Sequence, residues 1–402
     1  MELTAGFRRE PPLDPAAIGE DEALAARIRA EIATGGPMPF ARFMELALYD
    51  PDGGYYRSAE ARPGRAGDFL TAPETHPIFG HVVARQLAEA WERLGRPDPF
   101  VVREHGAGTG ALAEAILRGL AAEGAQLLDS IRYQAIEVDE RRVAAFGERL
   151  AAAGFDGLVE PADTRPVSGV VLANEVLDAL PVHRVGWRDG RLAERFVDVD
   201  GDTFVDTWAV PSTPALAQRL ADDGIVLADG QSAEICLGLD AWLDGALAGL
   251  ARGLLLLVDY GAPATELYDP GRRPHGTLRA YVRHRVHDDV YRHVGRQDLT
   301  AHVDLTALER AALAAGLTAV GSTTQAEFLV GGGIEDLLRS VQADPATTAP
   351  AYVELRSGLM RLLDPAATGG FRVIGFGRAW PDGPPLSGFA YRGPRRRWIS
   401  RS

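Results

Sequence analysis

A glycine-rich run, Glu104-His-Gly106-Ala-Gly108-Thr-Gly110, has residue types and spacing that could hold a cofactor. It lies between an apolar run, Phe100 to Val102, and a stretch with helical spacing from Ala111 to Leu120. Glycine lets the backbone turn sharply and lets a ligand approach closely. The free N–H groups at the start of the following helix attract a carboxylate or phosphate. The run therefore predicts an anion-binding turn between a strand and a helix.

Two cofactors fit such a turn, a dinucleotide and S-adenosylmethionine. The glycines satisfy the relaxed dinucleotide fingerprint, but the acid expected there lies ~20 residues on. Glu137 lies 31 residues beyond Gly106. Gly110 follows Gly108 at a spacing of two, and Glu104 precedes the first glycine. These points favour S-adenosylmethionine and leave NAD as an alternative.

Acids after the next strands could complete the cofactor site. Glu137 ends the apolar run from Ile131 to Val138 and could grip both ribose hydroxyls by charge-assisted hydrogen bonds. Asp139 competes for that role. Asp163 is a candidate for the adenine amine, with a solvated loop acid as the alternative.

A further polar group, Asn174, Glu175 and Asp178, follows the apolar run Val170 to Ala173. A carboxylate can fix the planar fork of a guanidinium bidentately. These three residues are the catalytic candidates if the acceptor is a guanidinium. The alternative for the acids is dipole stabilisation at a helix N-terminus.

These residues require a scaffold in which strands and helices alternate. Continuous apolar strands separated by helices indicate a parallel sheet covered on both faces. The region before residue 99 reads as mainly helical. The predicted helices are Asp21 to Ile32, Pro39 to Tyr49 and Pro77 to Leu94, and further strands are Leu254 to Val258 and Phe371 to Phe376.

Two regions interrupt the alternation. Arg184 to Val210 contains Asp189-Gly190 and Asp200-Gly201 between runs of Val, Phe and Trp, which predicts an antiparallel meander. Ala262 to Asp304 is polar, with little periodicity, and reads as a long loop, of the kind that is usually functional or disordered.

Composition excludes several function classes. All 42 basic residues are Arg, so no catalytic lysine is available, and the net charge of −14 argues against a nucleic-acid surface. Cys236 is the single cysteine, which rules out an intrachain disulfide and a Cys-based zinc site. No apolar run approaches the ~20 residues that cross a membrane, and no secretory h-region is seen. We expect a cytoplasmic protein of a GC-rich bacterium, without a metal.

Several separate segments together resemble the MidA family of class I S-adenosylmethionine-dependent methyltransferases, over about residues 36 to 376. They are Gly67-Asp-Phe-Leu-Thr-Ala-Pro-Glu74, Ile78-Phe79-Gly80, Asn174-Glu-Val-Leu-Asp-Ala-Leu-Pro-Val-His183, Val258-Asp-Tyr-Gly261, Gly276-Thr-Leu-Arg-Ala-Tyr281 and Asp298-Leu-Thr-Ala-His-Val-Asp304.

The resemblance implies a Rossmann-like α/β sheet with a helical N-terminal segment and an inserted, partly antiparallel substrate lobe. It implies S-adenosylmethionine as cofactor and a protein or peptide arginine as acceptor, because the family includes a mitochondrial complex I assembly factor that methylates arginine. Asp68 and Glu74 fall in the segment that resembles a cofactor lid. His183, Arg279, His302 and Asp304 also fall in family-like segments and are weaker candidates, since a lone loop His is more often structural.

The implied organisation has six parts. They are a helical lid region (1–98), a methyltransferase core (99–183 and 250–262), an inserted meander and helix (184–249), an acceptor-side insertion (263–303), a C-terminal part of the core (304–380) and a tail (381–402). A homodimer is compatible with it.

Departures from the family pattern concern the acceptor. His105, Ala107 and Thr109 replace the usual non-glycine residues of the turn, and Leu177 replaces an aromatic residue. A small-molecule methyltransferase and a non-catalytic assembly factor are therefore the alternatives, because a fold does not fix a substrate.

Overall fold

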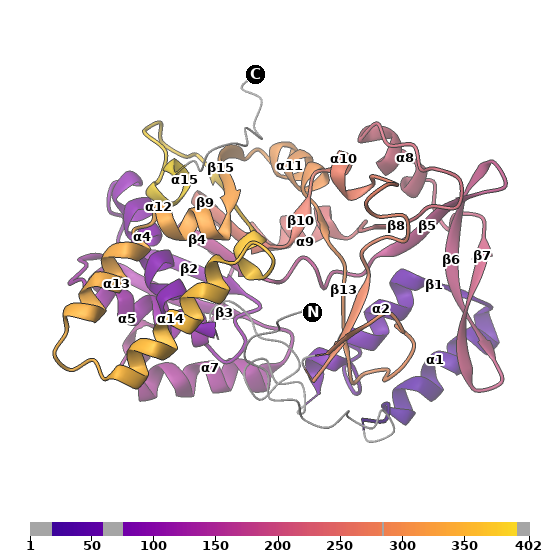
Figure 1. Ribbon diagram of the computed structural model, residues 1–402, viewed down its shortest axis with the longest axis horizontal. Helices are drawn as coiled ribbons and strands as arrows, with labels where there is room; N and C mark the ends of the chain where they lie inside the picture. Colours follow the sequence, from indigo (N-terminus) through magenta and orange to yellow (C-terminus); the bar gives the residue numbers. More distant parts are fainter. Residues whose placement is uncertain (1–17, 59–74, 284, 392–402) are drawn as a thin grey trace.

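The computed structural model describes residues 18–58, 75–283 and 285–391. Figure 1 shows two lobes side by side: a sheet flanked by helices, and a smaller lobe of antiparallel strands and the first two helices. Among the described helices, none is long and apolar enough to cross a membrane.

The larger sheet has the order β15-β16-β9-β4-β2-β3. Neighbouring strands among β2, β3, β4 and β9 run parallel, and β16 runs antiparallel between β9 and β15. The bounds are β2 Phe100–His105, β3 Ile131–Ile136, β4 Val167–Asn174, β9 Leu250–Asp259, β15 Thr318–Thr324 and β16 Arg372–Arg378. The predicted α/β sheet and its last strand are thus confirmed. Because parallel strands end at one edge, the polar residues that follow β2, β3, β4 and β9 are brought to that edge.

Helices cover both faces of this sheet, as the apolar strands predicted. One face packs on α4, α5, α7, α12, α13 and α14, and the other on α9 and α11. The bounds are α4 Ile78–Arg93, α5 Ala111–Ala122, α6 Leu127–Ser130, α7 Glu140–Ala152, α9 Leu239–Ala246, α11 Leu305–Ala314, α12 Gln325–Gly331, α13 Ile334–Ala343, α14 Ala349–Leu363 and α15 Ser387–Ala390, with single 3-10 turns η3 Asp156–Leu158 and η4 Thr368–Gly370.

The smaller lobe is built on the predicted meander. Its strands have the order β1-β6-β5-β8, with β7 on β6, all antiparallel. Asp189 and Gly190 take positive φ angles of 50° and 75° in the two-residue turn between β5 and β6, as such hairpins require. The bounds are β1 Met38–Pro39, β5 His183–Arg188, β6 Arg191–Asp200, β7 Thr203–Ala209, β8 Ser232–Ile235 and α8 Ala215–Asp222.

The predicted N-terminal helices form, and they pack into the smaller lobe. They are α1 Glu22–Gly35 and α2 Phe40–Tyr49, followed by the 3-10 turn η2 Tyr55–Arg57. β1, which lies between α1 and α2 in the sequence, pairs with β6, so residues 22–49 are part of this lobe. Phe40 and Phe43 are fully buried in its core, and each contributes ~1.5–3 kcal/mol.

The described residues of the polar region from Ala262 to Asp304 form short strands and a helix, so reading the region as one long loop was wrong. It contains the three-stranded antiparallel sheet β12-β11-β13 and a short parallel pair, β10 with β14. Ala280, Val282 and Leu299 are buried, and their neighbours carry the polar side chains. Strands of three or four residues are too short to show a clear alternation of apolar and polar residues in the sequence. The bounds are β10 Gly261–Ala262, α10 Ala264–Leu267, β11 Arg279–Val282, β12 Arg285–His287, β13 Asp298–Thr300 and β14 Val303–Asp304.

Candidate functional site

The glycine run forms the predicted turn between β2 and α5. Gly106, Gly108 and Gly110 have φ angles of 65°, 55° and 84°, in the left-handed region that favours glycine. A Cβ on Gly110 would lie 2.9 Å from Cδ2 of Phe146, whereas one on Gly108 would meet no atom within 4 Å. Gly108 therefore faces open space where a ligand can approach the backbone.

Glu137, directly after β3, is aimed at this turn. Its Oε1 accepts a 2.7 Å hydrogen bond from the N–H of Gly108, and its Oε2 accepts one of 3.1 Å from Val138. Asp139, the competing acid, caps α7 by accepting from the N–H of Arg141 at 3.0 Å and also pairs with that side chain. The geometry favours Glu137 over Asp139 for the ribose.

Glu104 is buried at the end of β2. Its Oε2 accepts a 2.5 Å hydrogen bond from the hydroxyl of Tyr133 on β3. Burial, with a smaller contribution from the charge of Glu137, raises the pKa of Glu104 to about 8. A cationic group bound nearby would favour the ionised carboxylate, which suits the ammonium of a methionine moiety.

The loop after β4 holds the three catalytic candidates together. Glu175 has a positive φ of 54°, rare for a residue with a side chain, and its N–H donates to the carbonyl of Val258 at 2.8 Å. Asn174 Nδ2 donates to Glu175 Oε1 at 3.1 Å. Asn174 Oδ1 is buried and has no hydrogen-bond partner within the described residues. A buried acceptor without a partner is costly, and it marks a place where a ligand N–H can donate.

Asp259, which the sequence analysis did not single out, fixes this loop. Its Oδ2 accepts from the N–H groups of Val176, Leu177 and Asp178 at 3.2, 2.8 and 3.3 Å. Burial and the charges of Asp178 and Glu175 raise the pKa of Asp259 well above its usual range. In the sequence, the only feature that could have indicated a role for Asp259 was its position at the end of an apolar run, inside a segment that resembles the family.

Asp178 is buried beside Tyr260, the residue after Asp259. Burial raises the pKa of Asp178 to about 6, and the hydrogen bond from the Tyr260 hydroxyl limits that rise. Tyr260 also contacts the ring of His302 at a centroid distance of 5.1 Å. Tyr260 is a second residue that sequence reasoning missed.

The smaller lobe brings further polar groups close to this loop. The hydroxyl of Tyr56, on η2, donates to Asp298 Oδ1 at 2.8 Å. The hydroxyl of Tyr49 donates to the carbonyl of Ala179 at 2.9 Å. Burial and the charges of Asp298 and Asp178 raise the pKa of both tyrosines. These groups, from three separate stretches of chain, were not foreseen as parts of one cluster.

The remaining predicted residues have other surroundings. Asp163 lies four residues before β4, where it pairs with Arg165 at 2.6 Å and Arg103 at 3.6 Å, so its contact with adenine stays a prediction. Asp68 and Glu74 lie outside the described residues.

The weaker candidates have mainly structural partners. His183 bonds the buried Glu194 at 2.6 Å, and Arg279 pairs with the exposed Asp288 at 3.4 Å. Asp304 caps α11 through the N–H groups of Thr306 and Ala307. Burial lowers the pKa of His302 to about 4, so its ring is neutral at physiological pH.

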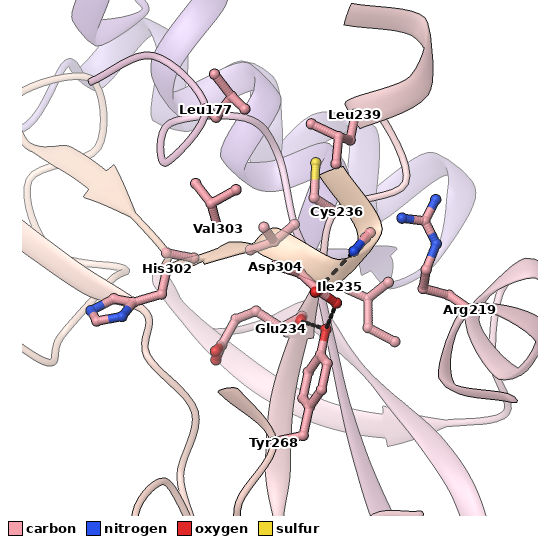
Figure 2. A pocket seen from close by; sticks show the side chains of 13 residues that line it. Leu177, Arg219, Glu234, Ile235, Cys236, Leu239, Tyr268, His302, Val303 and Asp304 are labelled. Carbon is pink, nitrogen blue, oxygen red and sulfur yellow. Dashed lines mark hydrogen bonds between the residues drawn. The ribbon is translucent and has the colours of Figure 1, made fainter. Parts of the chain in front are cut away.

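A cavity of about 20 Å³ lies behind the loop after β4 and is drawn in Figure 2. The hydroxyl of Tyr268 points to Asp304 at 3.2 Å across it, and Leu177 and Cys236 line another side. Its size suits about one water molecule. It is too small for an adenosyl cofactor and is separate from the glycine turn. Within the described ranges, no group of three His, Cys, Asp or Glu residues is placed to hold a metal.

Comparisons with known proteins agree with this geometry. Residues 82–323 match the model of a family described as S-adenosyl-L-methionine-dependent methyltransferase. The mitochondrial protein arginine methyltransferase NDUFAF7 homolog of Drosophila melanogaster is 28% identical over 395 residues, 90% of this chain and 87% of the fly protein. The human NDUFAF7 protein is 28% identical over 84% of this chain and 79% of its own length. A Burkholderia thailandensis protein crystallised with S-adenosyl-homocysteine has 38% identity and a TM-score of 0.85, over 97% of this chain and 99% of that one.

Proposed function

Because this chain belongs to the MidA family of class I S-adenosyl-L-methionine-dependent methyltransferases, we propose that it N-methylates an arginine side chain of a protein or peptide. The names of the fly and human relatives support arginine as the acceptor. The chemistry of the loop after β4 supports it independently, because carboxylates are the natural partners of a guanidinium.

The residues at the glycine turn fit the cofactor. Gly108 leaves room for close approach, and Glu137, which is hydrogen-bonded to the Gly108 N–H, would bind the ribose. The first turn of α5 has no side-chain cap to block its N–H groups. Glu104 would hold the methionine end. When bound, the cofactor supplies a methyl group on a sulfonium, and the protein contributes alignment, which is worth up to roughly 7–11 kcal/mol.

The observation that carries the proposal is the unpartnered Oδ1 of Asn174. It can accept a hydrogen bond from a guanidinium N–H and so orient the attacking nitrogen. The Glu175 and Asp178 carboxylates can fix the other N–H groups of the same planar fork. The methylated nitrogen must lose one proton, and Asp178, with a pKa of about 6, is a suitable acceptor.

The direct test is to incubate the protein with methyl-labelled S-adenosylmethionine and host lysate, then hydrolyse the labelled proteins. We expect labelled methylarginine, and at least ~10-fold less from Asn174→Ala and Glu175→Gln. Glu335→Gln, on an exposed face of α13 beside Arg339, is the matched control and should keep full activity. Label only in small molecules, or none at all, would refute arginine methylation.

We also propose that the enzyme works in a bacterial cytoplasm. The support is its composition: arginine replaces lysine throughout, and Cys236 is the single cysteine. The similarity to a Burkholderia protein points the same way.

A further inference from the structure

We propose that an acidic segment of the acceptor protein docks on an arginine-rich face of the smaller lobe. This inference rests on the proposed function and adds to it a class of acceptor, a protein with aspartates or glutamates near the methylated arginine. The face is one side of the strands β5, β6 and β7, which lie at the right-hand edge of the molecule in Figure 1. We call it the arginine face, after Arg184, Arg188, Arg191 and Arg195.

The strand register brings these four arginines to one side of the sheet. Arg184 pairs with Arg195, and Arg188 pairs with Arg191, across β5 and β6. Partners in register share a face, and successive residues of a strand alternate between the two faces. The three acids of β6 are an odd number of residues from each arginine of that strand, so they lie on the opposite face. β5 and β6 thus place their arginines and their acids on opposite sides.

The Arg184–Arg195 pair has acidic partners within the chain. Like charges directly opposite each other are unfavourable in a sheet. Burial and then the charge of Arg184 lower the pKa of Arg195, as this arrangement predicts. Asp206 on β7 forms ion pairs with both arginines, and Glu234 on β8 lies in register with Arg184. The repulsion within this pair is therefore offset by the chain itself.

Arg188 and Arg191 keep their charge without such partners. In the part of the chain that the structure describes, neither forms an ion pair with an acid, and Arg191 is exposed. The Cζ atoms of Arg188 and Arg195 each lie 4.7 Å from the centroid of the Trp208 ring. Stacking uses the flat face of a guanidinium and leaves N–H donors on its edges for a carboxylate. This end of the arginine face therefore offers two guanidinium forks to an anionic ligand.

The arginine face is only partly covered by the rest of the lobe. Its other end carries Val197 and Phe204, which belong to the core that α1 and α2 form. That core contains none of the four arginines. A Cβ on Gly186 would lie 2.8 Å from Cη2 of Trp208, so the indole lies against the sheet between the strands that carry the arginines. The end with Arg188 and Arg191 is thus a fixed surface, and Arg191 is open to a partner.

An acidic protein segment fits this surface better than a nucleic acid does. The net charge of −14 repels an extended polyanion, whereas a few carboxylates can be held by a local group of guanidinium forks. Asp178 and Arg188 are ten residues apart, which is at most about 35 Å of extended chain. An extended acceptor with its arginine at the loop after β4 would therefore reach the arginine face within about ten residues.

The first test measures binding and does not depend on methyl transfer. In fluorescence anisotropy at low salt, a labelled peptide of six glutamates should bind the full chain, and a peptide of six glutamines should not. Salt at ~0.5 M should weaken the binding at least ~5-fold. We expect about 2–5-fold weaker binding to Arg191→Gln and about 5–20-fold weaker binding to the double variant Arg188→Gln/Arg191→Gln. Arg356→Gln, at an exposed position on α14, is the matched control and should leave the affinity unchanged.

The second test uses the reaction. Two peptides each carry one arginine, flanked within ten residues by glutamates in one peptide and by glutamines in the other. For the wild type, KM should be at least ~5-fold lower for the glutamate peptide. For the double variant, the two peptides should have the same KM, with kcat unchanged. Because Arg191 is exposed, Arg191→Gln remains informative if the double variant does not fold.

Equal binding of the glutamate peptide to the wild type and to both variants would overturn the inference. Tighter binding of a single-stranded DNA of six nucleotides would also overturn it, because the arginine face would then belong to a nucleic acid. Failure of the proposed function is distinguishable from both outcomes. In that case the wild type would form no methylarginine, while the binding of the glutamate peptide would still depend on Arg188 and Arg191.

Discussion

The carboxylate of Glu137 and the backbone N–H of Gly108 are joined by a 2.7 Å hydrogen bond, which ties the end of β3 to the middle of the glycine turn. The acid is thus held at the turn before any cofactor arrives. A ribose diol that binds here offers two hydroxyl donors to the same carboxylate. We therefore predict a ribose site whose carboxylate is already held in position by the protein.

Glu137→Gln should weaken binding of S-adenosylmethionine by about 10–100-fold, because charge-assisted hydrogen bonds to a carboxylate are worth ~1.5–3 kcal/mol. Calorimetry measures this directly. Asp139→Asn is the matched control, since Asn also caps helices well and Asp139 contacts α7. If Asp139→Asn lost as much affinity as Glu137→Gln, the assignment of the ribose to Glu137 would be wrong.

Alanine at two glycines of the turn should separate folding from binding. In Gly110→Ala the Cβ meets Phe146 at 2.9 Å with φ of 84°, so we expect a loss of roughly 2–4 kcal/mol of unfolding free energy. In Gly108→Ala the Cβ points to open space, so only the backbone cost of ~1–2 kcal/mol remains, while cofactor affinity falls sharply. Denaturant unfolding and calorimetry distinguish the two. The prediction would be contradicted if the two variants lost the same cofactor affinity and had the same free energy of unfolding.

Glu104 should make the free protein less stable as the pH rises. Its folded pKa of about 8 lies above the ordinary 4.5, so between these values the folded state holds a proton that the unfolded state has lost. The stability due to this proton is full below pH ~4.5 and is lost as the pH rises through about 8, by roughly 2–4 kcal/mol.

Thermal unfolding of the wild type and Glu104→Gln from pH ~6 to ~9 checks this, and the variant should have the flatter profile. Asp178 and Asp304, both with pKa about 6, contribute mainly at the lower end of that range. Parallel profiles of the two proteins would show that Glu104 is already ionised in the free protein.

Asp259→Asn should lower the turnover of the acceptor more than the binding of cofactor. The amide presents an NH₂ group to backbone donors, so the bonds from Val176, Leu177 and Asp178 or from Tyr260 are lost in part. We expect kcat to fall about 10-fold or more, with affinity for S-adenosylmethionine within about two-fold. An exposed acid, Asp240, serves as the control as Asp240→Asn. Unchanged kcat would show that the loop holds its geometry without Asp259.

The fold of the core could be predicted from the sequence, because its strands are continuous apolar runs. β2, β4 and β9 lie where Val and Leu cluster, and Gly106 to Gly110 mark the turn. β15, with the residues Thr318-Ala-Val-Gly-Ser-Thr-Thr324, is half polar and was missed. β11 and β13 were missed because their buried residues, Ala280 and Leu299, pack in one core with α1 and α2, which local pattern does not reveal.

In the candidate site, the positions of Glu104 and Glu137 were predictable, because each acid lies at the end of an apolar strand beside the glycine turn. The role of Asp259 was not predictable, because its carboxylate accepts hydrogen bonds from backbone N–H groups that are distant in the sequence, such as that of Leu177. The Tyr56 and Asp298 pair spans 242 residues of sequence, and no local spacing can indicate such a contact. The cluster became visible only when both lobes were in place.

The pairing of β1 with β6 has a consequence for motion. The smaller lobe takes its core from the first helices, from the meander and from the strands near Leu299, with strands of the larger sheet between them in the chain. The backbone therefore passes repeatedly from one lobe to the other, and no single linker can act as a hinge between them. Any relative motion of the two lobes would therefore have to bend several backbone connections at the same time.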